Sequence, residues 1–215
     1  YFKNDLLYSR DELFSILEIN NKLDFIFFAT KSPNCYVSNQ YVSQLILNAI
    51  NNKELIKECQ LLVRLHPIYY RMHNSKQIYS NFIRDFEILA NENNRMTLNQ
   101  PKIESKSMNY AMPDDEIKLL SSILKHSSLV VNIFSTLNIE ASIFDVPIVN
   151  ISFEGEMLEN FKKARLNIDQ DLNETHNQRI VRSGGVNMVY ESQKLIPSIN
   201  EELINPNRRR LGRRK

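Results

Sequence analysis

The sequence predicts a doubly wound α/β fold, in which a Rossmann-like parallel sheet carries helices on both faces. Apolar runs with the length of buried strands occur at residues 25–30, 60–65, 128–134 and 147–152. Helical patterns of apolar residues lie between these runs, most clearly at residues 40–57. Strands that alternate with helices of this length form βαβ units, and such units build a parallel sheet with right-handed crossovers.

The first elements of the chain follow this scheme. Ser9 and Glu12 have the three-residue spacing of a capping box, which predicts a helix that begins at residue 10. The run at residues 25–30 is apolar on both faces, as is typical of a central parallel strand. The next strand ends at His66-Pro67, because a proline restricts the residue before it to extended conformations.

Residues 69–106 are less regular and rich in Asn, Lys, Arg and Ser. Within this stretch we expect an amphipathic helix around residues 79–89 and a strand near residues 96–98. The remainder shows neither a helical nor a strand period. We therefore predict a helical insertion at residues 69–106, on the surface of a single domain that spans residues 1–215.

The pattern is clear again from Pro113 onward. A proline followed by three acidic residues is typical of a helix start, because acidic side chains complement the positive end of the helix dipole. The helix ends at His126, where a cation complements the opposite end, so we assign this histidine a structural role. A strand, a helix and a strand follow within residues 128–152, and Gly184-Gly185 precede a last strand and helix at residues 186–204.

Composition and charge exclude several classes of function. No apolar run approaches the ~20 residues that a membrane-spanning helix needs. Cys35 and Cys59 lack metal-ligand spacing, and two free thiols indicate a reducing compartment, so we expect a cytoplasmic protein.

The net charge of +2 is unevenly distributed. Residues 208–215 carry six basic groups, and the rest of the chain has 21 basic and 25 acidic residues, a net charge of −4. A nucleic-acid-binding fold needs a basic face interleaved with aromatic residues, which this sequence lacks. We therefore predict no nucleic-acid binding, and interpret the basic tail as the solvated end of a helix or a weak contact with anionic lipid or phosphate.

Candidate binding residues follow the predicted strands, where open α/β sheets bind their ligands. Ser135 is a natural N-cap, and the helix behind it offers free backbone N–H groups and a positive dipole end, which suit a diphosphate. Thr136 and Glu140 are four residues apart and share a helix face. The Glu140 carboxylate then lies one turn below the phosphate site, where it can accept hydrogen bonds from ribose hydroxyls. The alternative is a plain capped helix with an acidic first turn.

Arg64 and His66 alternate at the end of the second strand, so we expect both side chains to point the same way. Arg binds phosphate through two parallel hydrogen bonds, and His donates a hydrogen bond or titrates near neutral pH. The alternative is an exposed Arg and a His that close a strand end.

We predict no metal site. The four histidines do not fall at metal-ligand spacing. Asp169-Gln170-Asp171 is a pattern that can hold a divalent ion on a donor diphosphate. It follows no apolar strand and lies in a polar stretch, so we interpret it as a solvated loop.

With these residues assembled, the chain resembles the C-terminal, donor-nucleotide-binding domain of bacterial GT-B glycosyltransferases from surface-polysaccharide synthesis, and the related CDP-glycerol glycerophosphotransferases. The resemblance rests on LVRLHP at residues 62–67, MPDDE at residues 112–116 and SLVVNIFSTLNIEASIFDVPIVNISFEG at residues 128–155. The sequence departs from this pattern at Phe134 and Asp145, where glycine is frequent. The likeness concerns the fold and most of the chain, and does not specify a substrate.

The resemblance implies a role for each candidate residue. The substrate-binding residues would be Arg64, His66, Met112, Ser135, Thr136 and Glu140. The two hydroxyl side chains would hold the donor phosphates and the glutamate the ribose. Arg64 and His66 would reach the phosphate or the transferred group, and the loop at Met112 would flank the base. The general base of GT-B enzymes usually comes from the N-terminal acceptor domain, so we assign no general base in this chain. His66 is the one candidate for a catalytic residue.

The implied function is that of the donor-binding half of a metal-independent nucleotide-sugar glycosyltransferase. We expect no cofactor and a UDP- or CDP-linked donor; a glycan or lipid-linked acceptor would bind through an N-terminal domain outside this chain. The chain alone would then bind donor without completing the transfer, in the cytoplasm or in peripheral contact with the inner face of the membrane.

Three alternatives remain open. A CDP-glycerol-type glycerophosphotransferase shares the resemblance. A sugar-nucleotide 2-epimerase has the same fold, but its usual Gly-rich turn is replaced here by Phe134-Ser135-Thr136. A third alternative, from a different class, is a domain that binds or assembles without catalysis.

Overall fold

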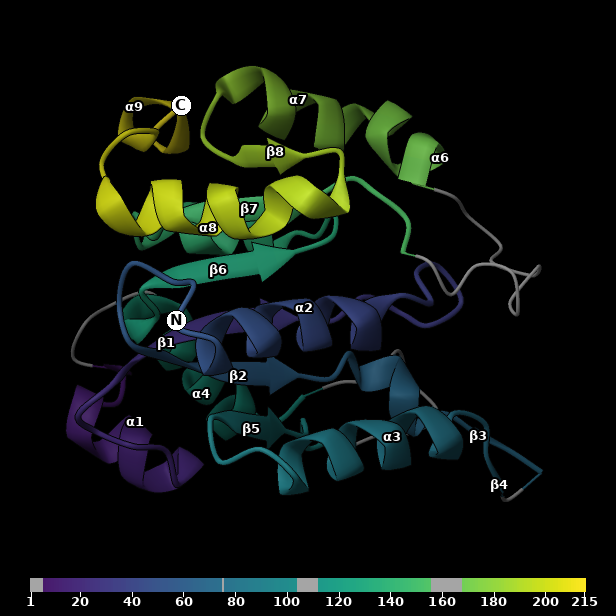
Figure 1. The fold of residues 1–215 in the computed structure, drawn as a ribbon. Helices are drawn as coiled ribbons and strands as arrows, with labels where there is room; N and C mark the ends of the chain where they lie inside the picture. The colour runs from purple at the N-terminus through teal and green to yellow at the C-terminus, as the bar shows by residue number, and fades with distance from the viewer. Residues whose placement is uncertain (1–5, 75, 104–111, 156–167) are drawn as a thin grey trace.

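The computed structural model describes residues 6–74, 76–103, 112–155 and 168–215, which contain one sheet of six parallel strands (Figure 1). Their order across the sheet is β5-β2-β1-β6-β7-β8. The strands are β1 (Asp24–Ala29), β2 (Cys59–Arg64), β5 (Met96–Asn99), β6 (Leu129–Asn132), β7 (Ile148–Ile151) and β8 (Asn187–Val189). The strand order reverses between β1 and β6, which defines a doubly wound α/β domain, as predicted.

Helices cover both faces of the sheet. The face toward the viewer in Figure 1 carries α2 (Asn39–Asn51), α3 (Ser80–Asn91) and α8 (Leu195–Ile204). The opposite face carries α1 (Arg10–Leu17), α4 (Asp114–His126) and α5 (Leu137–Ile143). The remaining elements are α6 (Ile168–Asn173), α7 (Thr175–Ser183), α9 (Arg210–Arg213), the 3₁₀ turns Pro67–Tyr70 and Ser192–Lys194, and a hairpin of β3 (Met72–His73) and β4 (Lys76–Gln77). Within the described ranges, no helix combines the length and the apolar character needed to cross a bilayer.

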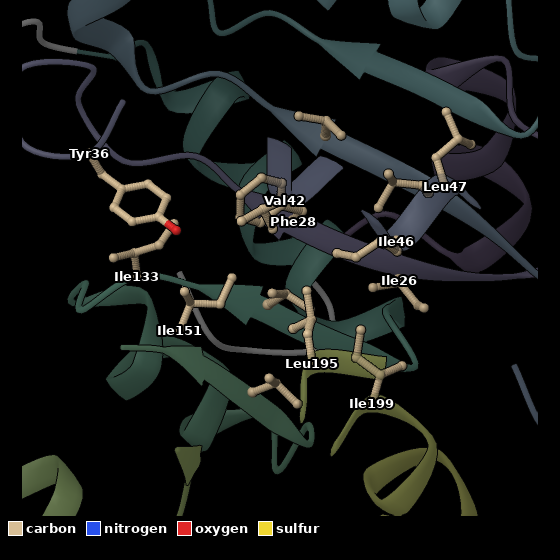
Figure 2. Close-up of a cluster of buried hydrophobic side chains, with 14 of the residues drawn as sticks. Ile26, Phe28, Tyr36, Val42, Ile46, Leu47, Ile133, Ile151, Leu195 and Ile199 are labelled. Carbon is tan, nitrogen blue, oxygen red and sulfur yellow. The ribbon is translucent and has the colours of Figure 1, made fainter. Parts of the chain in front are cut away.

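Each face of the sheet has its own apolar core because side chains alternate along a strand. On β1, Ile26 and Phe28 point into one core, and Phe25 and Phe27 point into the other; all four are fully buried. Helices α2 and α8 close the first core with Val42, Ile46, Leu47, Leu195 and Ile199 (Figure 2). Full burial of one such side chain contributes about 1.5–3 kcal/mol, so the two cores fix the sheet between its helices.

The predicted capping box at the start of α1 is confirmed. The Ser9 Oγ accepts a hydrogen bond from the Glu12 backbone N–H at 3.4 Å, and the Ser9 N–H donates to the Glu12 carboxylate at 2.8 Å. Such a cap contributes about 0.5–2 kcal/mol, and it starts the helix that covers β1.

The described part of residues 69–106 belongs to the sheet, so the prediction of a helical insertion on the surface was wrong. Helix α3 buries Ile83, Phe86 and Leu89 in the first core. Strand β5 pairs in parallel with β2, its Met96 opposite Leu61. The helix expected around residues 79–89 and the strand expected near residues 96–98 are confirmed. Their place in the sheet was not predicted, because β5 lies at the edge of the sheet and α3 exposes one full face to solvent.

The C-terminal tail is folded against the domain, so its interpretation as the solvated end of a helix was also wrong. Asp145 pairs with Arg210 and Arg213 at N–O distances of 2.5 and 3.0 Å, and the Arg213 side chain is fully buried. Gly212 lies so close to Gly184 that an added Cβ atom would sit 2.4 Å from a Gly184 carbonyl carbon. At this contact the backbones of the tail and of Gly184 lie so close together that only glycine fits at position 212.

Candidate functional site

The carboxyl ends of β1 and β6 lie side by side where the strand order reverses. The register pairs Phe28 of β1 with Val131 of β6, so the residues after each strand, 30–32 and 133–136, are neighbours at one edge of the sheet. Doubly wound folds bind ligands in the crevice outside the carboxyl ends of their strands, at this switch point. The structure therefore places Ser135 and Thr136 where a ligand is expected.

Three buried asparagines, which the sequence patterns did not single out, hold the turn between β6 and α5. The Asn150 Oδ1 accepts hydrogen bonds from the Phe134 backbone N–H at 3.0 Å and from the Asn138 Nδ2 at 2.9 Å. The Asn132 Nδ2 donates to the Asn138 Oδ1 at 2.9 Å. All three side chains are at most 1% exposed. A buried polar group left unpaired costs about 1–3 kcal/mol, so this network fixes the backbone after β6.

Phe134 occupies a position in this turn that favours glycine. Its φ of 36° lies in the left-handed region, which costs a non-glycine residue about 1–3 kcal/mol. The Phe134 side chain is buried in the first core, and this burial offsets the strain. Asp145, the other departure from the family pattern, has a φ of 56°. Both residues therefore keep the backbone geometry that glycine commonly supplies.

Ser135 and Thr136 lie at the start of α5, with the cap one residue later than expected. Thr136 is the N-cap and is exposed. Ser135 is half-buried, and its Oγ accepts a hydrogen bond from the Leu137 backbone N–H at 3.3 Å. The exposed Thr136 hydroxyl makes no capping bond of its own, so it is available at the switch point.

Glu140 lies in the first turn of α5 and is half-buried. Burial raises the pKa of its carboxyl above the ordinary value. Within the part of the chain that the structure describes, no side chain pairs with this carboxylate. The buried residues of α5 are Asn138 and Ala141. A half-buried carboxylate without a partner among these residues can accept hydrogen bonds from a ligand.

Arg64 ends β2 in an ion pair and does not face a ligand. Its Nη2 lies 2.7 Å from the Glu116 Oε2 of α4 and 3.7 Å from the Met112 sulfur, and its Nη1 donates to the Asn99 Oδ1 of β5. The two charged side chains are at most 6% exposed. The guanidinium is enclosed between β2, β5 and α4 and paired with Glu116, so it does not offer the two free N–H groups that the predicted phosphate contact needs. Arg64 is a positioning residue, which holds Met112.

A pocket of about 250 Å³ adjoins this ion pair. Asn99 and Gln100 from the end of β5 and Asp115 and Glu116 from the start of α4 line it. Met112, predicted to flank the base, is half-buried next to this cluster. The structure thus brings Arg64 and Met112 together on the β2 side of the edge and places Ser135, Thr136 and Glu140 on the β6 side.

His66 follows β2 and is exposed at the same edge of the sheet. Its Nδ1 accepts a hydrogen bond from the Ile68 backbone N–H at 3.1 Å, and its own backbone N–H donates to the Thr30 Oγ1 at 2.9 Å. The pKa of His66 lies below its ordinary value because nearby atoms remove part of the hydration of the ring and the Lys31 ammonium adds a positive charge. A neutral imidazole whose Nδ1 accepts carries its proton on Nε2, so His66 offers a hydrogen-bond donor.

Lys31 lies two residues beyond β1 and was missed in the sequence. Its Nζ forms an ion pair with Asp171 of α6, and the two side chains are 14% and 11% exposed. Asp171 therefore belongs to a helix at the switch point, and the interpretation of Asp169-Gln170-Asp171 as a solvated loop was wrong. The available signal was a lysine directly after the first predicted strand. Over the described ranges, no group of three or more His, Cys, Asp or Glu side chains is placed to hold a metal ion.

No protein-family model and no curated protein matches the chain, whereas solved structures match it by fold. A UDP-GlcNAc 2-epimerase from Neisseria meningitidis, bound to UDP-GlcNAc, has a TM-score of 0.60 and 13% identity over 94% of this chain. The C-terminal domain of the glycosyl transferase group 1 family protein LpcC from Francisella tularensis has a TM-score of 0.50 and 12% identity over 97% of this chain. The wall teichoic acid polymerase TagF, in a structure with CDPG, has a TM-score of 0.50 and 14% identity over 97% of this chain.

The lengths covered show which part of these proteins the chain resembles. The chain spans 43% of the epimerase and 39% of the polymerase, but 91% of the LpcC C-terminal domain. The likeness therefore corresponds to one domain of a longer protein. It confirms, at the level of the fold, the predicted resemblance to GT-B glycosyltransferases and related 2-epimerases.

Proposed function

We propose that this chain is the donor-binding domain of a nucleotide-sugar glycosyltransferase. The switch point between β1 and β6 carries the proposal, because Lys31 follows one strand while Ser135 and Thr136 follow its neighbour. The fold likeness supports it, since solved structures with this fold include one bound to UDP-GlcNAc and the domain of a glycosyl transferase.

The phosphates of the donor would bind at the start of α5. The backbone N–H groups of residues 137–140 already donate within this turn, so the Thr136 hydroxyl and the positive end of the helix dipole would hold the diphosphate, and Lys31 adds a positive charge that Asp171 partly balances. These groups would stabilise the negative charge that develops on the leaving diphosphate without requiring a metal ion. His66 would donate a hydrogen bond from Nε2 to the phosphate or the transferred group.

The nucleoside would lie along the same edge. Glu140 would accept hydrogen bonds from the ribose hydroxyls, as acidic residues do in dinucleotide folds. Met112, held by Arg64, would flank the base. The acceptor, a glycan or a lipid-linked sugar of the bacterial surface, and the general base would come with a second domain, as in the two-domain enzymes that the chain resembles.

A thermal-shift panel of UDP, CDP, GDP, ADP and CMP tests this proposal. A ligand at ~100 times its Kd stabilises the folded state by about 2.7 kcal/mol, which raises the Tm of a domain this size by roughly 5–10 °C. We expect a diphosphate of uridine or cytidine to give the largest rise. If no nucleotide raises the Tm at millimolar concentration, the proposal fails.

A sugar-nucleotide 2-epimerase is the second candidate. Its Gly-rich turn is replaced here by Phe134-Ser135-Thr136, but Phe134 adopts the left-handed backbone that such a turn requires. Inversion at C2 of a sugar must break and remake a C–H bond, so an epimerase incorporates solvent deuterium at C2. NMR of UDP-GlcNAc in D₂O with the full-length protein separates the candidates: C2 deuteration supports the epimerase, and its absence alongside sugar transfer supports the glycosyltransferase.

A further inference from the structure

A pocket at the amino ends of β2 and β5 lies outside the proposed donor site. We name it the amino-end pocket; among the residues that line it are Ile50, Lys53, Leu55, Lys57, Glu58 and Arg95. They come from the end of α2, from the connection between α2 and β2, and from the turn before β5. In Figure 1 these two strands begin at the side away from their arrowheads, whereas donor binding is proposed at the carboxyl ends of the sheet.

The lining of this pocket is positively charged. It contains three cations, Lys53, Lys57 and Arg95, and one carboxylate, Glu58, which leaves a net charge of +2. Across the described ranges, none of the three cations forms an ion pair with an Asp or Glu side chain. Their charge is therefore available to an anion from solution.

Arg95 gives the clearest indication of such a ligand. It is half-buried, and no side chain or carbonyl within the described part of the chain accepts a hydrogen bond from its guanidinium. A guanidinium has five N–H donors, and donors that are partly removed from water without acceptors cost free energy. A phosphate group supplies two acceptors in the geometry that arginine prefers.

The backbone around Arg95 is held in place. Its carbonyl accepts a hydrogen bond from the Leu61 N–H of β2 at 2.8 Å. The Asn51 Nδ2 at the end of α2 donates to the Asn93 Oδ1 in the turn before β5 at 3.3 Å. The parts of the chain that line the pocket are thus joined to each other.

Cys59, the first residue of β2, also lines the pocket but does not balance its charge. Burial and the Asp24 carboxylate raise the pKa of the Cys59 thiol to about 11, although the Lys57 ammonium acts in the opposite direction. The thiol is therefore neutral at physiological pH.

Lys53 has a structural explanation of its own. It follows the carboxyl end of α2 with a φ of 59°, and a cation there complements the negative end of the helix dipole. Its charge alone does not require a ligand. Lys57 and Arg95 therefore carry the argument and are the residues to vary.

The size of the pocket limits the ligand. Its volume is about 200 Å³, below the roughly 300–1,000 Å³ of pockets that hold drug-sized ligands. This favours a ligand smaller than a nucleotide. The half-buried Ile50 and Leu55 offer an apolar wall, so a ligand with a few carbon atoms suits the pocket better than a bare ion.

We propose that the amino-end pocket binds a small phosphate monoester. Lys57 and Arg95 contact the phosphate oxygens. The carbon skeleton of the ligand packs against Ile50 and Leu55. A ligand here leaves the carboxyl ends of β1 and β6 free, so the proposal does not rest on the proposed function.

An NMR titration of the 215-residue protein with phenyl phosphate, in a buffer without phosphate, tests the proposal. We expect the backbone amide signals of Lys53, Glu58 and Arg95 to shift along one saturating curve. The Kd should rise with salt, because the lining charges are partly exposed to solvent. Inorganic phosphate, which lacks the carbon skeleton, should bind more weakly.

Variants then test the cations. Arg95→Gln should raise the Kd for phenyl phosphate roughly tenfold or more, because it removes charged hydrogen-bond donors. Lys57→Gln should raise it roughly threefold, since an exposed cation contributes less. Arg179→Gln is the matched control, because Arg179 is exposed on α7, beside β8 at the opposite edge of the sheet from β5. The thermal unfolding midpoint of each variant checks that it remains folded.

A further variant separates this pocket from the donor site. Ser135→Ala with Thr136→Ala should leave the Kd for phenyl phosphate at the amino-end pocket unchanged, and saturating UDP should not displace phenyl phosphate from it. Failure of UDP to bind at all would overturn the proposed function and leave this pocket supported by its own titration.

Four results would overturn the phosphate site. One is the absence of shifts at Lys53, Glu58 and Arg95 with millimolar phenyl phosphate. The second is an equal Kd in Arg95→Gln and Arg179→Gln. The third is displacement of phenyl phosphate from these residues by UDP. The fourth, inorganic phosphate bound as tightly as phenyl phosphate, would rule out a monoester as the ligand.

Discussion

The Nη2 of Arg64 and the Oε2 of Glu116 lie 2.7 Å apart in an ion pair that is at most 6% exposed. The pair joins the end of β2 to the start of α4, and a further hydrogen bond from Arg64 to Asn99 extends it to β5. A charged side chain so fully enclosed has no water to replace a lost partner. The pair therefore fixes the end of β2 against β5 and the start of α4.

Loss of one partner of this pair should be costly. We expect Glu116→Gln to lower the free energy of unfolding by about 3–5 kcal/mol, because it leaves the Arg64 charge buried and uncompensated. Urea denaturation measures this change. The control is Asp115→Asn, since the Lys102–Asp115 pair spans 3.4 Å with side chains 72% and 55% exposed, and such pairs contribute at most about 1 kcal/mol. Equal losses in the two variants would contradict the role of the buried pair.

Disruption of the asparagine network should also lower the free energy of unfolding, because it leaves buried polar groups without a hydrogen-bond partner. Asn150→Ala removes the acceptor of both the Phe134 backbone N–H and the Asn138 amide, so we expect a loss of about 2 kcal/mol or more in the free energy of unfolding. The control is Asn48→Ala, because the exposed Gln44–Asn48 bond should contribute no more than about 0.5 kcal/mol. An Asn150→Ala protein as stable as the control variant would show that the network does not hold the turn.

The raised pKa of Glu140 makes a prediction about pH. The folded state keeps the Glu140 proton at a higher pH than the unfolded state, so this residue destabilises the wild type as pH rises above the ordinary carboxyl pKa of 4.5. Glu140→Gln has no ionisable carboxyl group at this position, so it lacks this pH-dependent loss of stability. Its free energy of unfolding should therefore increase relative to wild type between about pH 4 and pH 7. Glu58→Gln, at an exposed glutamate, is the control, and a parallel pH profile for the Glu140 variant and wild type would contradict the prediction.

The sequence was sufficient to predict the elements whose apolar period is strong. The strands at β1, β2, β6 and β7 and the helices between them were found because their side chains must fill two cores. The helix and the strand of the third βα unit were also predicted, but they were interpreted as a surface insertion because the strand lies at the edge of the sheet and has only four residues. Short helices α6 and α7 were missed because their composition is polar.

The chemistry of the site was only partly predictable. Positions follow from strand ends, so Ser135, Thr136 and His66 lie just beyond the carboxyl ends of their strands, as expected. Pairing depends on tertiary contacts that no local pattern records. Glu116 is 52 residues from Arg64, and Asp171 is 140 residues from Lys31. The role of Arg64 therefore became clear only when its partner was placed.

Glu140 should discriminate ribose from deoxyribose. A hydrogen bond to a charged acceptor contributes about 1.5–3 kcal/mol, so Glu140→Gln should weaken ribonucleotide binding roughly tenfold or more and abolish the preference over the 2′-deoxynucleotide. Calorimetry with both nucleotides in both proteins measures this. If the wild type shows no preference, or the variant keeps it, Glu140 only complements the helix dipole, worth about 0.3–1 kcal/mol.

The most direct test of donor binding at the switch point is a calorimetric comparison of a nucleoside diphosphate with its nucleoside. The ligand is the diphosphate, UDP or CDP, that gives the larger thermal shift, and the protein is either wild type or the variant with Ser135→Ala and Thr136→Ala. We predict that the double variant binds the diphosphate roughly tenfold or more weakly and the nucleoside almost unchanged, because the lost hydroxyls contact phosphate. An equal loss for both ligands, or no loss for either, would contradict a phosphate site at the start of α5.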